Sequence, residues 1–332
     1  MPELRKDPIV DRWVIISSER GKRPTDFLNI VEEKKDIFSP FTAGNEDMTP
    51  PEIFAIRPEH GAPNTPGWTL RVVPNKYPAL RVEGQLNRRG DGIYDMMNGV
   101  GAHEVIIETP DKDRTLGDLD IPSIENVFRV FKERILDLKK DIRLKYAMIF
   151  KNHGFAAGAT VKHSHSQLIA TPIIPKLVLE ELHGANAYYN LKERCIFCDI
   201  IRQELKDNTR VVYDEEFFIA LEPFAARSPF ETWILPKEHF SHYEMIDEIR
   251  IRHLSITFKT VMQKLNIALQ TPPYNFVLHK APMQESPMRH YHWHLEIMPK
   301  LTRFAGFEWG TGFYINPTSP EDAAQFLKEI GV

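Results

Sequence analysis

Histidine and glutamine alternate with serine in the run His163-Ser164-His165-Ser166-Gln167. In a β-strand, residues two apart point to the same side, so His163, His165 and Gln167 would form one polar row. A neutral imidazole can attack phosphorus near pH 7 when its other ring nitrogen is held as a donor. Gln167 can donate to a phosphoryl oxygen but cannot carry a proton, which suits a leaving group such as a sugar phosphate. The run therefore predicts phosphoryl transfer through a histidine.

A small-residue segment, 152–160, lies directly before this run. It contains Asn152, Gly154, Gly158 and Thr160, which supply backbone N–H groups, little steric bulk and a hydroxyl. These groups can form an anion-binding concavity. Two other interpretations are that the histidines decorate an exposed strand, or that they bind a metal by themselves. Neither explains the glycine-rich segment, so we expect a phosphate cradle.

Two segments of the chain repeat one layout of strand, helix, strand and histidine run. His163 follows Lys112 by 51 residues, and His290 follows His239 by the same 51. Matching order and spacing indicate a duplicated unit. We therefore expect corresponding sites in the two halves.

Hydrophobic periodicity places the elements that must position these runs. Apolar residues recur with helical spacing at 124–138 and 251–265, which predicts one core-facing helix in each half. The proline-rich segment 24–78 indicates loops and short strands, and 172–194 indicates the connection between the halves. Ser319, followed by proline, predicts the N-cap of a last helix.

Bulk composition excludes several classes of protein. The chain has 332 residues, 42% of them hydrophobic, enough for two domains or one large two-lobed unit. The net charge of −4 gives no global reason to bind nucleic acid, and the apolar runs are too short for a membrane span. We expect a cytoplasmic protein. The two cysteines, Cys195 and Cys198, are too close for a secreted disulfide framework and indicate a metal or redox pair.

The second half resembles a histidine-triad protein, with the Cys195 and Cys198 pair, then His239, then alternating histidines at 290–294. The whole chain is similar to the galactose-1-phosphate uridylyltransferase family, in which two such units are fused. The resemblance runs nearly end to end and also includes the segments 7–13, 44–52, 73–80, 152–167 and 303–308.

This resemblance implies an α+β fold, with two antiparallel half-barrel sheets each packed with helices. It implies a catalytic N-terminal domain at 1–175 and a second histidine-triad-like domain at 190–332. It also implies a homodimer with parts of both subunits at each site. The partners would be a nucleotide sugar and a sugar phosphate or phosphate.

The site residues follow from the resemblance position by position. His165 would carry the nucleotide covalently in a ping-pong cycle, with Gln167 binding the phosphoryl group. The implied substrate contacts are Asn152, Gly158 and Thr160 at the phosphate, Arg20, Arg23 and Asn75 at the nucleotide, and Glu308 at the sugar.

Many family members bind zinc in the first half, but this chain departs from that pattern. The corresponding positions are Ser39, Thr42, Lys112 and His163. Hydroxyl groups are poor zinc ligands and an ammonium repels the cation, so we expect no metal there.

The matching positions in the second half keep a complete set of zinc ligands. By the internal repeat these are Cys195, Cys198, His239 and His290, which predict structural zinc. The alternatives are two buried free thiols beside surface histidines, or a redox pair.

A further group resembles an iron-type site of some relatives, but the match is imperfect, and a polar core network or a degenerate copy of the active row is the favoured interpretation. Its residues are Glu181, His279, His292, His294 and Glu296.

The substrate is the least determined property. The segment 309–316, after Glu308, is similar to plant-type ADP-glucose phosphorylase. The leading prediction is uridylyl transfer from UDP-glucose to galactose 1-phosphate. The alternatives are adenylyl transfer from ADP-glucose or adenylylsulfate to phosphate, and a non-catalytic nucleotide-binding protein. Gln167, in place of a third histidine, argues against a hydrolase.

Overall fold

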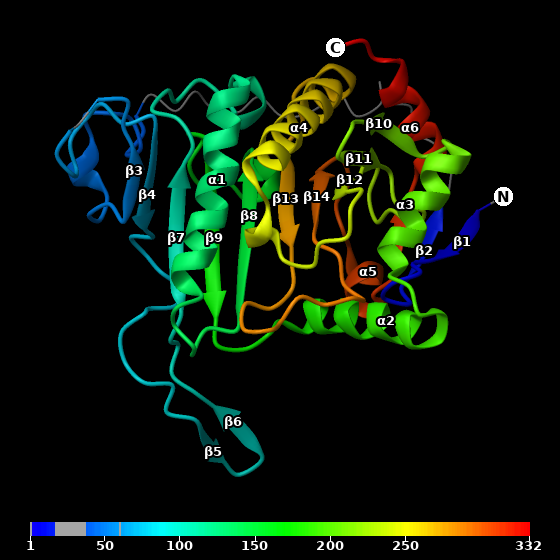
Figure 1. Cartoon of the computed structure of the whole chain (residues 1–332), viewed down its shortest axis with the longest axis horizontal. Helices are drawn as coiled ribbons and strands as arrows, with labels where there is room; N and C mark the ends of the chain where they lie inside the picture. Colours follow the sequence, from blue (N-terminus) through cyan, green and yellow to red (C-terminus); the bar gives the residue numbers. More distant parts are fainter. Residues whose placement is uncertain (1, 17–37, 60) are drawn as a thin grey trace.

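The computed structural model describes residues 2–16, 38–59 and 61–332 (Figure 1). Arg20 and Arg23 lie outside the described residues. A ten-stranded antiparallel sheet forms the centre of the molecule. Its strands, in spatial order, are β10 (Val211–Asp214), β11 (Phe218–Leu221), β12 (Thr232–Pro236), β14 (His294–Pro299), β13 (Tyr274–His279), β8 (Tyr146–His153), β9 (His165–Thr171), β7 (Ala102–Ile107), β4 (Leu70–Pro74) and β3 (Phe54–Ile56).

The two halves of the chain share this one sheet. Each half contributes five consecutive strands, and β8 of the first half pairs with β13 of the second, from Tyr274 opposite His153 to Leu278 opposite Ile149. The α+β class is confirmed, but the strands of the two halves form one continuous sheet instead of the two predicted, and the predicted half-barrels are not confirmed. Taken alone, the halves would leave the inner edge strands β8 and β13 with unpaired backbone N–H and C=O groups, and these two edges satisfy each other.

Two long helices, α1 (Ile121–Leu138) and α4 (Glu248–Leu269), cover one face of the sheet (Figure 1). The predicted helical periods at 124–138 and 251–265 lie within them. Asp120 and Asp247 cap the two helices by accepting a hydrogen bond from a backbone N–H in the first turn. Phe128 of α1 packs edge-on against Phe258 of α4, with ring centroids 5.5 Å apart, in the main hydrophobic core.

The predicted connection at 172–194 forms a helix, α2 (Lys176–Lys192), followed by α3 (Ile196–Asp207). The two helices contribute Val178, Leu182, Ile196 and Phe197 to a second hydrophobic core on the second half of the sheet. The remaining helices are α5 (Gly306–Thr311) and α6 (Pro320–Glu329).

The predicted cap of the last helix is confirmed, because the Ser319 hydroxyl accepts a hydrogen bond from the Asp322 backbone N–H at 3.1 Å. No helix in the described ranges is long and apolar enough to cross a membrane.

Two smaller sheets flank this body. The first contains β1 (Glu3–Lys6), β2 (Trp13–Ile16) and β15 (Tyr314–Asn316). The second is a hairpin of β5 (Arg89–Asp91) and β6 (Tyr94–Met96), which projects from the molecule (Figure 1). Short 3-10 turns occur at Glu46–Met48, Leu116–Asp118, Phe155–Ala157 and Tyr243–Met245.

Candidate active site and metal centre

His165 is the first residue of β9, and its ring is held by its own backbone. Nδ1 donates a hydrogen bond to the His163 carbonyl oxygen at 2.7 Å. A carbonyl can only accept, so the hydrogen of the neutral ring lies on Nδ1 and Nε2 keeps its lone pair. Phe41 packs edge-on against the ring, with centroids 5.3 Å apart. Nε2 of His165 is therefore the nitrogen available for attack.

His165 is 7% exposed, and its surroundings favour the neutral ring. Burial, together with the nearby Lys151 ammonium, lowers the pKa of His165 to about 4. At neutral pH the ring therefore needs no base to become a nucleophile.

The serines of the run face the opposite side of the sheet, as the alternation predicts. Ser164 and Ser166 donate to the Glu108 carboxylate at 2.6 and 2.5 Å. Lys151 donates to the same carboxylate at 2.6 Å and to the His165 carbonyl oxygen at 3.0 Å. Burial alone would raise the pKa of Glu108, but Lys151 and the two hydroxyls hold it below its ordinary value. This network fixes the backbone that carries His165.

Gln167 meets a residue that the sequence analysis did not predict as part of the site, His103 on β7. His103 Nε2 lies 2.9 Å from Gln167 Oε1. Asn75, a predicted nucleotide contact, lies beside them, because its Nδ2 is 3.1 Å from the same ring nitrogen. The sequence offers only one indication of this contact. Alternation along the strand places His103 on the same face as Val105, which lies opposite Gln167.

The predicted phosphate cradle is a tight turn between β8 and β9. Gly154 and Gly158 have φ of +79° and +87°, which favour glycine. Asn152, near the end of β8, lies against this turn. A methyl group in place of the Gly158 hydrogen would be in van der Waals contact with Asn152 Nδ2, at 3.8 Å. Asn275 of β13 donates to Asn152 Oδ1 at 2.8 Å and to the Ala157 carbonyl at 2.9 Å. Asn152 Nδ2 is thereby turned away from Asn275.

The other predicted contacts are less closely grouped. Thr160 is exposed, at the end of the turn. Glu308 lies on α5, where it accepts a hydrogen bond from the Ala305 backbone N–H at 2.9 Å, and its described contacts do not include the histidine row.

His163 lies just before β9 and makes two hydrogen bonds. Its Nε2 donates to the Thr109 carbonyl at 2.7 Å, so Nδ1 accepts from the Ser39 hydroxyl at 2.9 Å. Lys112 lies beside Asp113, with 3.5 Å between Nζ and Oδ1. At the position where relatives would hold zinc, this chain places a hydrogen bond between Ser39 and His163.

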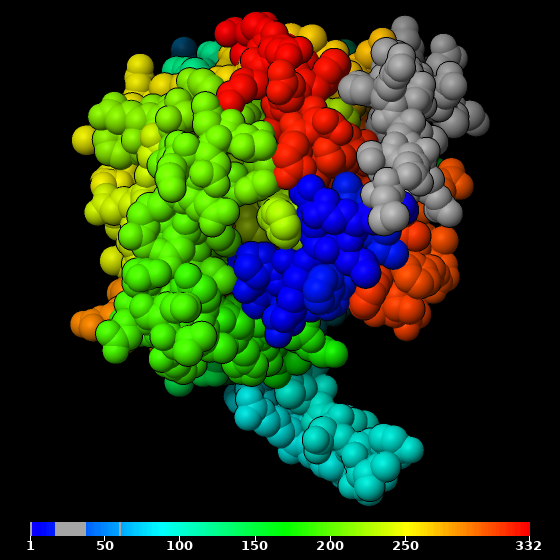
Figure 2. All heavy atoms as spheres, turned by 90° about the vertical axis from the view of Figure 1, so that its right-hand side faces the viewer, coloured from blue at the N-terminus to red at the C-terminus, as the bar shows by residue number. Residues whose placement is uncertain are grey.

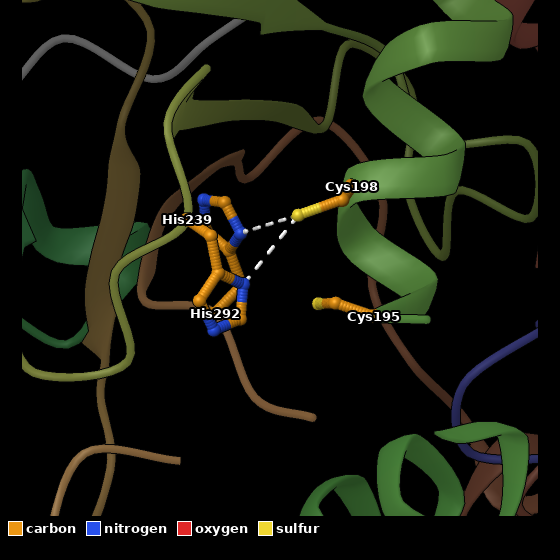
Figure 3. Close-up of side chains that lie close together, drawn as sticks. All are labelled: Cys195, Cys198, His239 and His292. Carbon is orange, nitrogen blue, oxygen red and sulfur yellow. Dashed lines mark hydrogen bonds between the residues drawn. The ribbon is translucent and has the colours of Figure 1, made fainter. Parts of the chain in front are cut away.

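Figure 3 shows the potential metal ligands of the second half, Cys195, Cys198, His239 and His292, directed toward one another. One ligand atom from each lies within 4.8 Å of the others. The fourth member is His292, so the prediction of His290 is wrong. His292 Nε2 donates to the Pro236 carbonyl at 2.8 Å, as His163 does to the Thr109 carbonyl. The equivalent of His163 is therefore His292, because the second half has two extra residues before it.

The donor set fits a tetrahedral metal ion. Cys195 is the N-cap of α3 and Cys198 lies in its first turn, where the helix dipole favours thiolates. His239 Nε2 donates to the Met288 carbonyl at 2.9 Å, so both histidines anchor Nε2 on a carbonyl and leave Nδ1 toward the sulfur atoms. Such outer hydrogen bonds orient metal-binding imidazoles.

A second polar cluster lies where the second half repeats the active row. The His279 and His294 rings stack at 4.8 Å, and Glu181 of α2 lies 3.2 Å from His279 Nδ1 and 3.3 Å from His294 Nε2. Burial opposes a charge here, but Glu181 and Glu296 raise the pKa of His279 to about 10. Arg227 pairs with Glu296. These ion pairs support the predicted polar core network, and the donors also lie close enough to hold a metal.

Residues 1–175 match the family model of the galactose-1-phosphate uridyl transferase N-terminal domain, and residues 181–318 match that of its C-terminal domain. The chain belongs to the galactose-1-phosphate uridylyltransferase family.

Two curated relatives of this family align with the whole chain. ADP-glucose phosphorylase of Arabidopsis thaliana is 39% identical, over 100% of this chain and 93% of the relative. Galactose-1-phosphate uridylyltransferase of Thermotoga maritima is 30% identical, over 100% and 99%.

Solved structures of the galactose-1-phosphate uridylyltransferase family show the same fold. A crystal structure of the Arabidopsis thaliana ADP-glucose phosphorylase with bound ADP-glucose has a TM-score of 0.86 and 37% identity, and covers 100% of both chains. A uridylyltransferase structure has a TM-score of 0.77 and 27% identity, covering 99% of this chain and 97% of the other.

A cavity of about 360 Å³ opens between the N-terminal strands and α3. Figure 2 shows this hollow between the blue N-terminal residues and the green helices. Its lining includes Ile9, Ile200, Glu204 and Trp233, and no histidine. The cavity is therefore separate from the row formed by His163, His165 and Gln167.

Proposed function

We propose that this protein transfers a nucleoside monophosphate from a nucleotide sugar through a covalent intermediate on His165. The observation that supports this most directly is the hydrogen bond from His165 Nδ1 to the His163 carbonyl, which leaves Nε2 unprotonated. Membership of the family supports the same chemistry. The catalytic domain would comprise residues 1–175, and residues 190–332 would form the second domain.

In the first step, the Nε2 lone pair attacks the α-phosphorus of the nucleotide sugar. A P–N bond forms and the P–O bond to the sugar phosphate breaks, so that the sugar phosphate leaves as an anion without taking a proton. Gln167 and Asn152 would donate to the phosphoryl oxygens, and Gly158 would line the phosphate site without a side chain. The N–H groups of residues 157–159 hold the turn itself together, because they donate to the carbonyl oxygens of Gly154 and Phe155. In the second step, an oxygen of the acceptor phosphate attacks, the P–N bond breaks, and Nε2 regains its lone pair.

Other contacts remain part of the proposal. Arg20, Arg23 and Asn75 would bind the nucleotide, Thr160 the phosphate, and Glu308 the sugar. Glu308 would reach the site from the partner subunit of a homodimer, since its described contacts do not include the histidine row.

We propose ADP-glucose and inorganic phosphate as the first donor and acceptor to test. The supporting observation is the higher identity to ADP-glucose phosphorylase, 39% against 30% for the Thermotoga maritima uridylyltransferase. The second candidate is UDP-glucose with galactose 1-phosphate, which the matched family models support. Adenylylsulfate is a further adenylyl donor for comparison.

Intact-mass measurement without acid quenching tests both candidates. The protein is incubated separately with ADP-glucose, UDP-glucose and adenylylsulfate, and an AMP or UMP adduct identifies the nucleotide. We expect His165→Gly to form no adduct but to transfer nucleotide from a nucleotide imidazolide to the acceptor. The imidazole that is bonded to phosphorus in this reagent fits the space of the missing ring, and it leaves when the acceptor oxygen attacks. Absence of an adduct with all three donors, together with no rescue of His165→Gly, would exclude the covalent mechanism and favour a non-catalytic nucleotide-binding protein.

A further inference from the structure

We propose that His103 is a positioning residue that fixes the amide of Gln167 as a hydrogen-bond donor toward the phosphoryl group. This inference rests on the proposed function, because it concerns the same site. In the register of β7 with β9, His103 lies opposite Ile169 and Val105 lies opposite Gln167. His103 and Gln167 are therefore diagonal neighbours on the same face of the sheet, within reach of each other's side chains.

A backbone contact determines which nitrogen of His103 carries the hydrogen. The Ala79 N–H donates to His103 Nδ1 at 3.1 Å. A backbone N–H can only donate, so Nδ1 holds a lone pair and the ring hydrogen lies on Nε2. Nε2 must then donate to Gln167 Oε1, which lies 2.9 Å away. The orientation of the Gln167 amide follows from the backbone of residue 79.

This arrangement leaves the nitrogen of the Gln167 amide free to act. With its oxygen held by His103, both amide hydrogens face away from the ring, and they make no hydrogen bond within the residues that the structure describes. A reversed amide would turn an oxygen toward the anionic phosphoryl group and repel it. His103 therefore selects the one of two amide orientations that can bind the transferred group.

His103 also connects Gln167 to the loop of residues 75–79. The Asn75 N–H donates to the His103 carbonyl at 2.8 Å, and the Tyr77 N–H donates to Asn75 Oδ1 at 2.9 Å, which forms a local turn at residues 75–77. Asn75 Nδ2, 3.1 Å from His103 Nε2, only touches it, because both nitrogens carry hydrogens. One imidazole thus links the proposed nucleotide loop with the proposed phosphoryl-binding amide.

A double-mutant cycle in single-turnover adduct formation tests this role, with ADP-glucose and UDP-glucose as probes. We expect His103→Leu to slow adduct formation about 10- to 100-fold with a smaller change in half-saturating donor concentration. His103→Gln should restore much of the rate, because its amide nitrogen can donate to Gln167. In a Gln167→Ala background, His103→Leu should cause no further loss. If the rate losses of His103→Leu and Gln167→Ala multiply in the double variant, the two residues act independently and the proposal is overturned.

Nuclear magnetic resonance of the 15N-labelled protein without substrate gives a readout independent of turnover. The Nε2–H tautomer of His103 is expected, together with a shifted Gln167 side-chain amide signal in His103→Leu. The Nδ1–H tautomer, or an unmoved Gln167 signal, would overturn the proposal. If the wild-type protein forms no adduct, the proposed function fails while this measurement still decides the role of His103. His183→Leu, at an exposed position on α2, controls for loss of an imidazole.

Discussion

Asn275 Nδ2 donates to Asn152 Oδ1 at 2.8 Å, across the junction between the two halves of the sheet. The same nitrogen donates to the Ala157 carbonyl in the turn before β9. The proposed phosphate cradle therefore belongs to the first half by sequence but is held in place by the second.

This contact predicts that a residue outside the proposed catalytic domain affects adduct formation. Asn275→Ala removes both hydrogen bonds, so Asn152 loses its fixed amide orientation, and we expect adduct formation to slow about 10-fold. Single-turnover rates and thermal unfolding should be measured together, with Asn186→Ala, at an exposed position on α2, as the matched control. An unchanged rate in folded Asn275→Ala would show that the cradle needs no support from β13.

The lowered pKa of His165 predicts an unusual pH dependence. Because burial keeps the ring neutral down to about pH 4, adduct formation should stay nearly constant from pH 8 to about 5 and fall near pH 4. In the unfolded chain the ring has its ordinary pKa, near 6.5, and takes up a proton first. The contribution of His165 to stability is therefore complete above pH 6.5 and is lost as the pH falls from there toward 4. A decline in the single-turnover rate centred near pH 6.5 would contradict the assignment.

The buried ion pair between Lys151 and Glu108 predicts a large loss of stability when one partner is replaced, and recovery of stability when both are replaced. Lys151→Met leaves the Glu108 carboxylate buried without a counter-ion, since the two side chains are 1% and 0% exposed. We expect a decrease of about 3–5 kcal/mol in the free energy of unfolding by urea. Combining it with Glu108→Gln should recover most of this loss, because the charge is removed. The glutamine oxygen can still accept from one serine hydroxyl, and its amide nitrogen can donate to the other. If the double variant is as unstable as Lys151→Met, the loss comes from packing.

The metal centre predicts different outcomes for two neighbouring histidines. The purified protein should contain about one zinc per chain, held by two thiolates and two imidazoles. His292→Ala should lose the metal and unfold at a lower temperature, whereas His290→Ala should keep it. Elemental analysis of the wild type and both variants decides this, and a wild-type content below about half a zinc per chain would refute the proposed site. No metal is expected at Ser39 and His163.

The sequence predicted best what depends on local periodicity. Residues two apart share a strand face, so the separation of Ser164 and Ser166 from His165 followed from alternation alone, and both long helices followed from their apolar stripes. Gln167 followed from the same alternation, and Asn152 from the small-residue segment before the run. His103 was missed because it meets Gln167 only through the register of β7 with β9, 64 residues away.

The equal spacing of 51 residues led to the wrong choice of His290. A residue count cannot reveal that the second half has two extra residues before the histidine that makes the repeated carbonyl contact. The carbonyl of Pro236, which accepts from His292, identifies the equivalent position, and the contact of His294 Nδ1 with the His292 carbonyl supports it. The pairing of β8 with β13 was missed for a related reason. Alternation reports which face of a strand is buried, not which edge finds a partner.

The junction between β8 and β13 also governs how the chain acquires its fold on the ribosome. β8 ends at His153, whereas its neighbour β13 starts at Tyr274, so more than a hundred residues are synthesised before the edge of β8 is covered. During that interval the proposed catalytic half carries an open strand edge, the kind of surface that pairs with other nascent chains. The second half therefore protects the first from such pairing, but only after β13 has been synthesised.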